Sequence, residues 1–538
     1  MSAAEAAAAP AQRGAQGTVR RLIVFTILFV LVVIAASGGS GLLGRLLETR
    51  PDISAGTGGL ALLLAFALIG GPLAAVLWWF QWRRLDGPDR SSFAWGLYLA
   101  AMSVVSLIAF STSLLTLVSD LIGGAWSPDA LATGIVWLAV WLLHRMMSVH
   151  PDKRPLRLTT ATTVIGAAYG LVVGATGAIR ALQAIFGEAL LAGEGQLGSP
   201  WWQGALQATA WALGGALIWW WHWLRERAIA LQDGFASVML VITGVLVAAA
   251  VALGGLGTSL FVGLRAAFDR SDPWGELLDP LPLAVAAAAV GAIVWVYHGR
   301  IARSRSERTR SASRLVEAGI GLSGAASGIG VVVNALLATL STSLAGADLR
   351  ALLLGGIASL VIGAPVWWAA WRPLRAREDA GAAGRRVYLV VVFGVSAVVA
   401  IVALLVVGYR IFEFALDNGA GDGLIERIRA PFGLLLATGL VAAYHLAVWR
   451  RDRAARPVQG SARTIDRVVL VSAGDDGPLA AAIQSATGAT VTRWVRADVA
   501  AAAASEAAVV QALEGVRGRR VLVVVGPGDR VEVVPLAG

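Results

Sequence analysis

Three histidines give this sequence its clearest candidate for chemistry. His144, His298 and His445 are separated by 154 and 147 residues, and each lies near the end of a long apolar stretch. Imidazole nitrogens bind transition metals and haem iron, so three such rings could converge on a metal, or two could hold a haem between helices. Each stretch supplies only one ring, however, and no carboxylate lies in register to orient it. We therefore predict no cofactor and keep haem or metal binding as an alternative.

Tryptophans cluster around these histidines. Fourteen of the 21 Trp residues lie near the same ends of apolar stretches, and Trp82, Trp223 and Trp371 form a series with spacings of 141 and 148 residues. Tryptophan rings favour the headgroup region of a bilayer, where the arginines that follow can meet anionic lipid. We therefore interpret Trp82, Trp223 and Trp371 as interfacial residues rather than as a binding site.

The two series share nearly one period, which predicts an internal repeat. The repeat divides the chain into three tandem four-helix units, at about 20–155, 156–310 and 311–456. A disordered cytoplasmic N-terminus (1–19) precedes them, and a cytoplasmic domain (457–538) follows. An even number of spans per unit keeps all three in the same orientation, so the repeats are parallel rather than inverted.

The composition predicts that these units lie in a membrane. Hydrophobic residues make up 57% of the 538 residues and charged residues only 14%, against about 25% charged residues in soluble domains. The absence of Cys excludes thiol chemistry. A membrane helix needs about 20 apolar residues, and twelve such stretches are present, at roughly 21–43, 57–80, 92–118, 130–149, 159–181, 203–223, 235–264, 281–299, 314–341, 351–371, 386–410 and 430–449.

Basic residues orient the spans. The segments after even-numbered helices, together with the N-terminus, hold 27 Lys and Arg residues, and the other six loops hold nine. The positive-inside rule then places both termini on the cytoplasmic side of a bacterial inner membrane. The net charge of +10 is mainly this topology signal, so we predict no nucleic-acid partner. The first stretch also has features of a cleaved signal peptide, but the first unit needs it as a retained span.

Four-helix membrane units whose alternate helices end in Trp/His/Arg clusters resemble a bacterial integral-membrane domain family of unknown function. The clusters include Trp82-Arg83, His144-Arg145 and Trp371-Arg372. The resemblance covers about residues 20–456. It implies a fold and a membrane location but no chemistry, and it does not extend to the C-terminal domain.

Glycines at helical spacing predict close helix packing. The fifth span carries Gly166, Gly170 and Gly174, and the ninth carries Gly324 and Gly328, both of the small-xxx-small type that lets helix backbones approach. We expect them to line a seam between units or a homo-oligomer contact. Charged residues are absent from the span midpoints, which disfavours an ion-coupled transporter.

The C-terminal segment has the pattern of a small α/β domain. We predict strands at 465–472, 489–495, 519–525 and 530–535, and helices at about 477–487 and 499–515. Asp475 and Asp476 follow the first strand, where α/β sheets often bind ligands. Capping of the next helix is the preferred interpretation of this pair over Mg²⁺ binding. A docking or regulatory module is the expected role of the domain.

The fold class predicted is therefore an all-α polytopic membrane protein with a small cytoplasmic α/β domain. No nucleophile–base constellation is present, so we predict a non-enzymatic scaffold or assembly partner. Its expected partners are the lipid bilayer and either other membrane subunits or a second copy of the chain. The alternative is a transporter or channel for an apolar or lipid-like solute that uses a seam between units.

Overall fold

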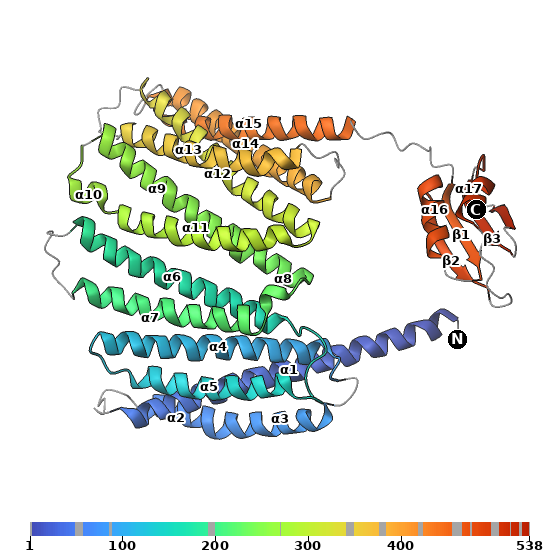
Figure 1. Cartoon of the computed structure of the whole chain (residues 1–538), viewed down its shortest axis with the longest axis horizontal. Helices are drawn as coiled ribbons and strands as arrows, with labels where there is room; N and C mark the ends of the chain where they lie inside the picture. The colour runs from blue at the N-terminus through green and yellow to red at the C-terminus, as the bar shows by residue number, and fades with distance from the viewer. Residues whose placement is uncertain are drawn as a thin grey trace. The chain divides into compact units, whose positions relative to one another are not determined.

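The computed structural model divides the chain into two compact parts (Figure 1). The membrane part contains Met1–Arg377 and Ala383–His445, and the C-terminal part contains Leu446–Gly538. The residues that the structure describes are 3–48, 57–85, 89–191, 200–269, 271–340, 349–375, 383–417, 423–454, 465–473, 476–496, 505–516, 518–526 and 530–536.

We group the helices of the membrane part by the three units that the sequence predicts. Unit one contains α1 (Ala3–Leu47), α2 (Thr57–Ala65), the π-helical turn η1 (Phe66–Gly70), α3 (Gly71–Arg84), α4 (Phe93–Ile122) and α5 (Pro128–Val149). Unit two contains α6 (Ala161–Leu191), α7 (Trp201–Trp220), the π-helical η2 (Trp221–Arg225), the 3₁₀ turn η3 (Ala228–Ala230), α8 (Gly234–Met239), the π-helical η4 (Leu240–Val247), α9 (Ala248–Phe268), α10 (Trp274–Leu278) and α11 (Leu281–Ser304). Unit three contains α12 (Glu307–Ala338), α13 (Leu349–Arg375), α14 (Ala383–Leu416) and α15 (Leu424–Ala454).

Eleven helical segments of the described chain are long and apolar enough to cross a membrane, against the twelve predicted. The difference is the predicted span 203–223. This segment does form a helix, because α7 continues directly into η2, but its tryptophans and two glutamines lower the mean hydropathy. The protein is thus a multi-pass membrane protein, as the sequence predicts.

The first helix begins earlier than the sequence analysis expects. Residues 1–19 are predicted to be disordered, whereas α1 is described from Ala3 onward. Six of the seven residues in 3–9 are alanine, which has the highest helix propensity of any residue. The part of α1 that is long and apolar enough to cross a membrane starts only at Gln16.

The helices pack in the same order in successive units. The first span of a unit lies against its second, as in α6 with α7 and α12 with α13, and in units one and two the third span lies against the fourth, α4 with α5 and α9 with α11. Each seam between units is also built alike: the third span of one unit packs on the first two spans of the next. Thus α4 contacts α6 and α7, and α9 contacts α12 and α13 (Figure 1).

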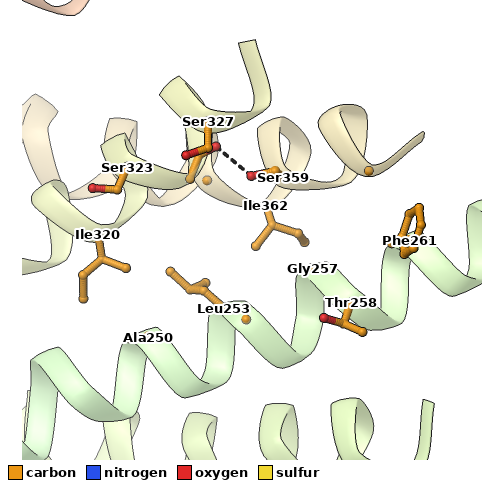
Figure 2. Close-up of a pocket in the computed structure, with 14 residues that line it drawn as sticks. Ala250, Leu253, Gly257, Thr258, Phe261, Ile320, Ser323, Ser327, Ser359 and Ile362 are labelled. Atoms are coloured by element: carbon orange, nitrogen blue, oxygen red, sulfur yellow. Dashed lines mark hydrogen bonds between the residues drawn. The ribbon is translucent and has the colours of Figure 1, made fainter. Parts of the chain in front are cut away.

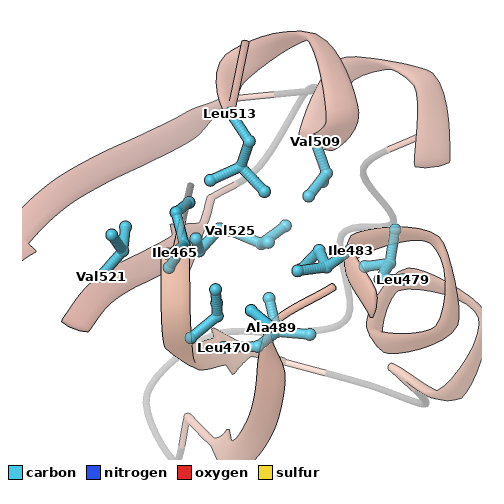
Figure 3. Close-up of a cluster of buried hydrophobic side chains, with 11 residues drawn as sticks. Ile465, Leu470, Leu479, Ile483, Ala489, Val509, Leu513, Val521 and Val525 are labelled. Carbon is cyan, nitrogen blue, oxygen red and sulfur yellow. The ribbon is translucent and has the colours of Figure 1, made fainter. Parts of the chain in front are cut away.

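The C-terminal part has a four-stranded mixed sheet, which confirms the predicted α/β domain. Its strands are β1 (Ile465–Ser472), β2 (Thr490–Val495), β3 (Gly518–Val525) and β4 (Val531–Leu536), in the order β2-β1-β3-β4. β1 pairs in parallel with β2 and β3, and β4 is antiparallel to β3. Helices α16 (Gly477–Thr487) and α17 (Glu506–Ala512) complete it. Alternate residues of β1 and β3 form one core with these helices, including Ile465, Leu470, Val521, Ile483 and Val509 (Figure 3).

Asp476 does not cap α16 with its side chain, which corrects that part of the sequence prediction. Its carboxylate instead accepts a hydrogen bond from Ser472 Oγ at 3.2 Å and pairs with Arg493 Nη1 at 3.2 Å. Asp476 thus links the end of β1, through Ser472, to β2, through Arg493. Asp475, the other member of the predicted pair, lies outside the described residues.

Candidate functional site

Four buried histidines share one local hydrogen bond. In His144, His222, His298 and His445, the Nδ1 atom lies 2.8–2.9 Å from the carbonyl oxygen four residues earlier in the helix. A carbonyl oxygen can only accept, so Nδ1 carries the proton and Nε2 is left as an acceptor. The predicted series thus has a common local structure, and His222 is a further member that the repeat spacing does not reveal.

In unit one, both ring nitrogens of His144 have partners. The Tyr98 hydroxyl lies 2.9 Å from Nε2 and donates to it, while Nδ1 is bonded to the Val140 carbonyl. Trp95 stacks on Tyr98 with ring centroids 5.7 Å apart, and Phe25 packs on both rings. Neither nitrogen of His144 is therefore free to bind a metal in this arrangement.

In units two and three a tryptophan–tyrosine hydrogen bond lies beside the predicted histidine, in place of the tyrosine–histidine bond of unit one. Trp223 Nε1 donates to the Tyr297 hydroxyl at 3.0 Å, and Trp371 Nε1 donates to the Tyr444 hydroxyl at 2.9 Å. Each tyrosine directly precedes the predicted histidine of its unit. In unit one that position is leucine, and Trp82 instead stacks on Trp78 with ring centroids 5.6 Å apart.

The structure does not bring the three predicted histidines together. His144, His298 and His445 each make their ring contacts within their own unit. Among the residues that the structure describes, no group of three His, Cys, Asp or Glu side chains is placed to hold a metal ion. The arrangement therefore supports packing and hydrogen bonding in this layer, not coordination.

The predicted interfacial tryptophans point mostly inward. Trp223 is 7% exposed and Trp371 is 0% exposed, and their indole nitrogens bond to tyrosines inside the unit. Neighbouring rings occupy the outer surface, because Trp79, Trp220 and Trp368 are all more than 40% exposed. The exposed rings of these clusters are therefore those of other tryptophans, and the interfacial belt stays a prediction.

The predicted glycines make their close contacts within units, although Gly324 also lines the seam between units two and three. A Cβ atom on Gly170 would meet the backbone nitrogen of Trp219, and one on Gly174 would lie 3.0 Å from that of Ala216. Gly324 and Gly328 face α13 in the same way, and Gly166 faces the His222 ring on η2. Close packing occurs here because the second span is also small at the contact, at Gly215 and Gly363.

A large opening lies at the seam between units two and three. This seam cavity has a volume of about 510 Å³ and is lined by α9, α12 and α13 (Figure 2). Its wall is built from small and hydroxyl-bearing residues with aliphatic side chains between them: Gly254, Gly257, Thr258, Ser323, Gly324, Ser327, Ser359, Leu253, Ile320 and Ile362.

The hydroxyl groups of the seam cavity are not all used by the helices. Ser359 Oγ donates to the Gly324 carbonyl at 2.8 Å, and Ser323 Oγ donates to the Gly319 carbonyl at 3.0 Å. Ser327 and Thr258 have no hydrogen-bond partner among the described residues. The cavity therefore offers an apolar surface with a few hydroxyl groups, which is the usual character of a small-molecule site.

The seam between units one and two is filled at the corresponding level. Leu115 of α4 packs directly onto Gly214 of α7, and Ser111 Oγ lies 2.9 Å from the Tyr169 hydroxyl of α6. Gly170 and Gly321 occupy matching positions, since each faces the first tryptophan of its cluster. Tyr169 therefore corresponds to Ile320, and Gly214 corresponds to Ile362. The second seam is open where the first is filled by a phenol ring and a leucine.

Comparison with known families agrees with the repeat. Residues 21–144 and 315–440 each match the family model of a domain of unknown function, DUF5671. The chain contains two copies of the DUF5671 domain. They coincide with units one and three, which is the four-helix period that the sequence predicts. No curated protein and no solved structure matches the chain.

Unit two separates the two DUF5671 copies and takes part in both seams. It forms the filled seam with the first copy and the cavity-bearing seam with the second. It also carries two π-helical turns, η2 beside Gly166 and η4 beside His298, and such turns are frequent at functional sites. The residues that line the seam cavity are not among those predicted from the sequence. A usable signal was the pair Ser323 and Ser327, one helical turn apart on the glycine face of α12.

Proposed function

We propose that this multi-pass membrane protein binds an apolar or lipid-like solute in the seam cavity, without transforming it chemically. The observation that carries the proposal is the difference between two seams of one repeat, because the same helix arrangement is filled at one and open at the other. The residues that line the open one include no histidine and no carboxylate, which favours binding over catalysis. Hydroxyl groups among aliphatic ones suit a solute that is mostly hydrocarbon.

Filling the seam cavity tests this proposal. A Cβ atom at Gly257 meets no atom within 4 Å, so Gly257→Leu places a side chain in the cavity without a backbone clash. Overpacking costs of about 1–3 kcal/mol correspond to a loss of affinity of about 5-fold to 150-fold. We expect native mass spectrometry of the purified full-length Gly257→Leu protein to show less bound lipid than the wild type, in line with this loss of affinity.

The matched control is Gly263→Leu in the same helix. Gly263 also has open space around its Cβ position and does not line the cavity, so bound lipid should stay at the wild-type level. A second filling variant, Ile320→Tyr, copies the residue of the filled seam and should behave like Gly257→Leu. If the wild-type protein carries no lipid, or if both filling variants bind it normally, the seam cavity is not the site and a scaffold role is favoured instead.

We further propose that the arginine-rich helix ends face the cytoplasm. The support is the distribution of 27 basic residues against nine and the positive-inside rule. Since the chain has no Cys, single cysteines can be labelled selectively. Gln232→Cys lies at the arginine-rich end and Ala125→Cys at the other, and both positions are exposed. In intact cells a membrane-impermeant maleimide should label the Ala125 variant alone, and labelling of the Gln232 variant alone would reverse the orientation.

A further inference from the structure

A second cavity lies at the arginine-rich end of the same pair of helices, α12 and α13. It has a volume of about 350 Å³, and we call it the charged cavity. It is lined chiefly by Trp295 and Arg303 of α11, Arg314 and Glu317 of α12, and Ala370 and Pro373 of α13. Glu317 is the only acidic residue of the predicted span 314–341, and the sequence analysis passed over it.

The charged cavity and the seam cavity lie one after the other along α12 and α13. Arg314 and Glu317 of α12 line the first, and Ile320, Ser323 and Ser327 line the second. On α13, Gly363 of the seam cavity and Ala370 of the charged cavity are about two helical turns apart and share one face. At 1.5 Å per residue, Glu317 and Ser327 are about 15 Å apart along the helix. This is about half the hydrocarbon thickness of a bilayer, or one leaflet. A ligand along this face would meet charge at one end and apolar surface over the rest.

The charges around the first cavity are only partly matched within the protein. Glu317 is 6% exposed, and Trp295 Nε1 donates to its carboxylate at 3.1 Å. The Arg303 guanidinium, however, is 3.8 Å from that carboxylate, too far for a hydrogen bond. Arg314 forms no ion pair with any residue that the structure describes. Arg303 thus forms only a loose ion pair with this buried carboxylate, and a cationic ligand group at hydrogen-bond distance would complete its charge pairing.

The charged cavity exists at the second unit junction because two residues differ from the first. Glu317 and Gly166 occupy matching positions, four residues before Gly321 and Gly170, and Ala370 matches His222 in the same way. At the first junction the His222 ring packs on Gly166 and leaves no room. At the second, alanine replaces the ring and a carboxylate replaces the glycine. The exchange of His222 for Ala370 opens space, and the exchange of Gly166 for Glu317 supplies a negative charge.

We propose that the bound solute is a zwitterionic amphiphile whose headgroup carries a phosphate and an ammonium group. Guanidinium groups suit phosphate oxygens, so Arg303 and Arg314 hold the phosphate. The Glu317 carboxylate holds the ammonium group, and the hydrocarbon chain extends along α12 into the seam cavity. This inference rests on the proposed function, because the chain of the ligand occupies the cavity described there.

Lipid competition on the full-length protein in detergent tests the headgroup assignment. Native mass spectrometry would compare binding of phosphatidylethanolamine, phosphatidylglycerol and free phosphoethanolamine. The wild type should prefer phosphatidylethanolamine over phosphatidylglycerol by about tenfold, the ratio expected for one charge-assisted contact. Glu317→Gln keeps the shape of the side chain and an acceptor for Trp295, and it should remove this preference while phosphatidylglycerol still binds. Arg314→Gln should weaken both lipids by about tenfold.

Arg300→Gln is the matched control, because Arg300 is exposed on α11 and does not line the charged cavity. An unchanged preference in Glu317→Gln would overturn the headgroup assignment, and the proposed function would stand if Gly257→Leu still abolished lipid binding. If free phosphoethanolamine competed as well as the lipid, the ligand would be a soluble phosphate ester and the amphiphile would be excluded. If the wild-type protein bound none of these lipids, the proposed function itself would be overturned.

Discussion

Replacement of Trp371 by alanine is expected to destabilise the membrane part by about 3–5 kcal/mol. Trp371 is 0% exposed, and its ring packs on Tyr388 and His445 with centroid distances of 5.2 and 5.9 Å. Alanine would leave a cavity among these rings and would remove the donor to the Tyr444 hydroxyl. The melting temperature of the purified protein in detergent measures this effect.

Trp368→Ala supplies the control for this prediction. Trp368 lies three residues earlier on α13 and is 46% exposed, so its loss should cost about 0.5 kcal/mol or less, as for other surface substitutions. The comparison separates inward packing from an interfacial role within one cluster. If both substitutions had equally small effects, the inward packing of Trp371 would be contradicted and the interfacial role that the sequence predicts would be supported.

The sequence predicts the helical framework well because hydrophobic length is a strong physical constraint on a membrane span. Two observations support the predicted repeat. His144, His298 and His445 lie on matching helices, and two of the three units match DUF5671. The α7 span is the exception. It is one of the twelve apolar stretches that the sequence predicts, but its tryptophans and glutamines keep its hydropathy below that of the other eleven.

The sequence predicts less well which way a side chain faces. A tryptophan at a helix end suits both the headgroup region and a buried contact with a hydrogen-bond acceptor, so Trp368 and Trp371 look alike in sequence. Glycine spacing has a similar ambiguity. It indicates close approach of a helix at Gly170 or Gly328 but does not identify the partner, which is the second span of the same unit.

The two cavities could not be predicted from local patterns, because each depends on side chains that are absent from facing helices. The seam cavity is open because Ile320 occupies the position of Tyr169 in unit two and because glycines of α9 face it. The charged cavity needs Ala370 opposite Glu317. These differences become visible only when the units are superimposed through their packing contacts, such as those of Gly170 and Gly321. Divergence between repeats, rather than any motif, is the signal for these cavities.

The outer faces of the array differ from its inner seams. At the seam between units one and two, Gln203 Nε2 donates to the Ile122 carbonyl at 3.1 Å, and Gln207 Nε2 donates to that of Ser119 at 2.9 Å. The outermost spans expose aliphatic side chains instead, such as Leu68 on η1 and Leu405 on α14. Lipid tails are as apolar as leucine, so these faces suit the bilayer. Association with a second copy stays a prediction.

Gly170→Leu is expected to have the second large effect on stability. The position has no space for a side chain, because a Cβ atom would meet the backbone of Ile218 and Trp219 on α7. Backbone atoms cannot move aside as a flexible side chain can, so α6 and α7 would have to separate along their contact. Overpacking of this kind should cost about 3 kcal/mol or more. The expected result is a lower melting temperature and a smaller yield of monodisperse protein.

Gly187→Leu is the matched control on the same helix, since a Cβ atom there meets nothing within 4 Å. It should change stability by about 0.5 kcal/mol or less. The location of the contact also matters for the result. Because Gly170 packs within unit two, its substitution should lower the stability of the monomer at every protein concentration, whereas a glycine at a contact between copies would alter only the oligomeric state. A stable Gly170→Leu monomer with changed assembly would therefore contradict the intra-unit packing of α6 and α7.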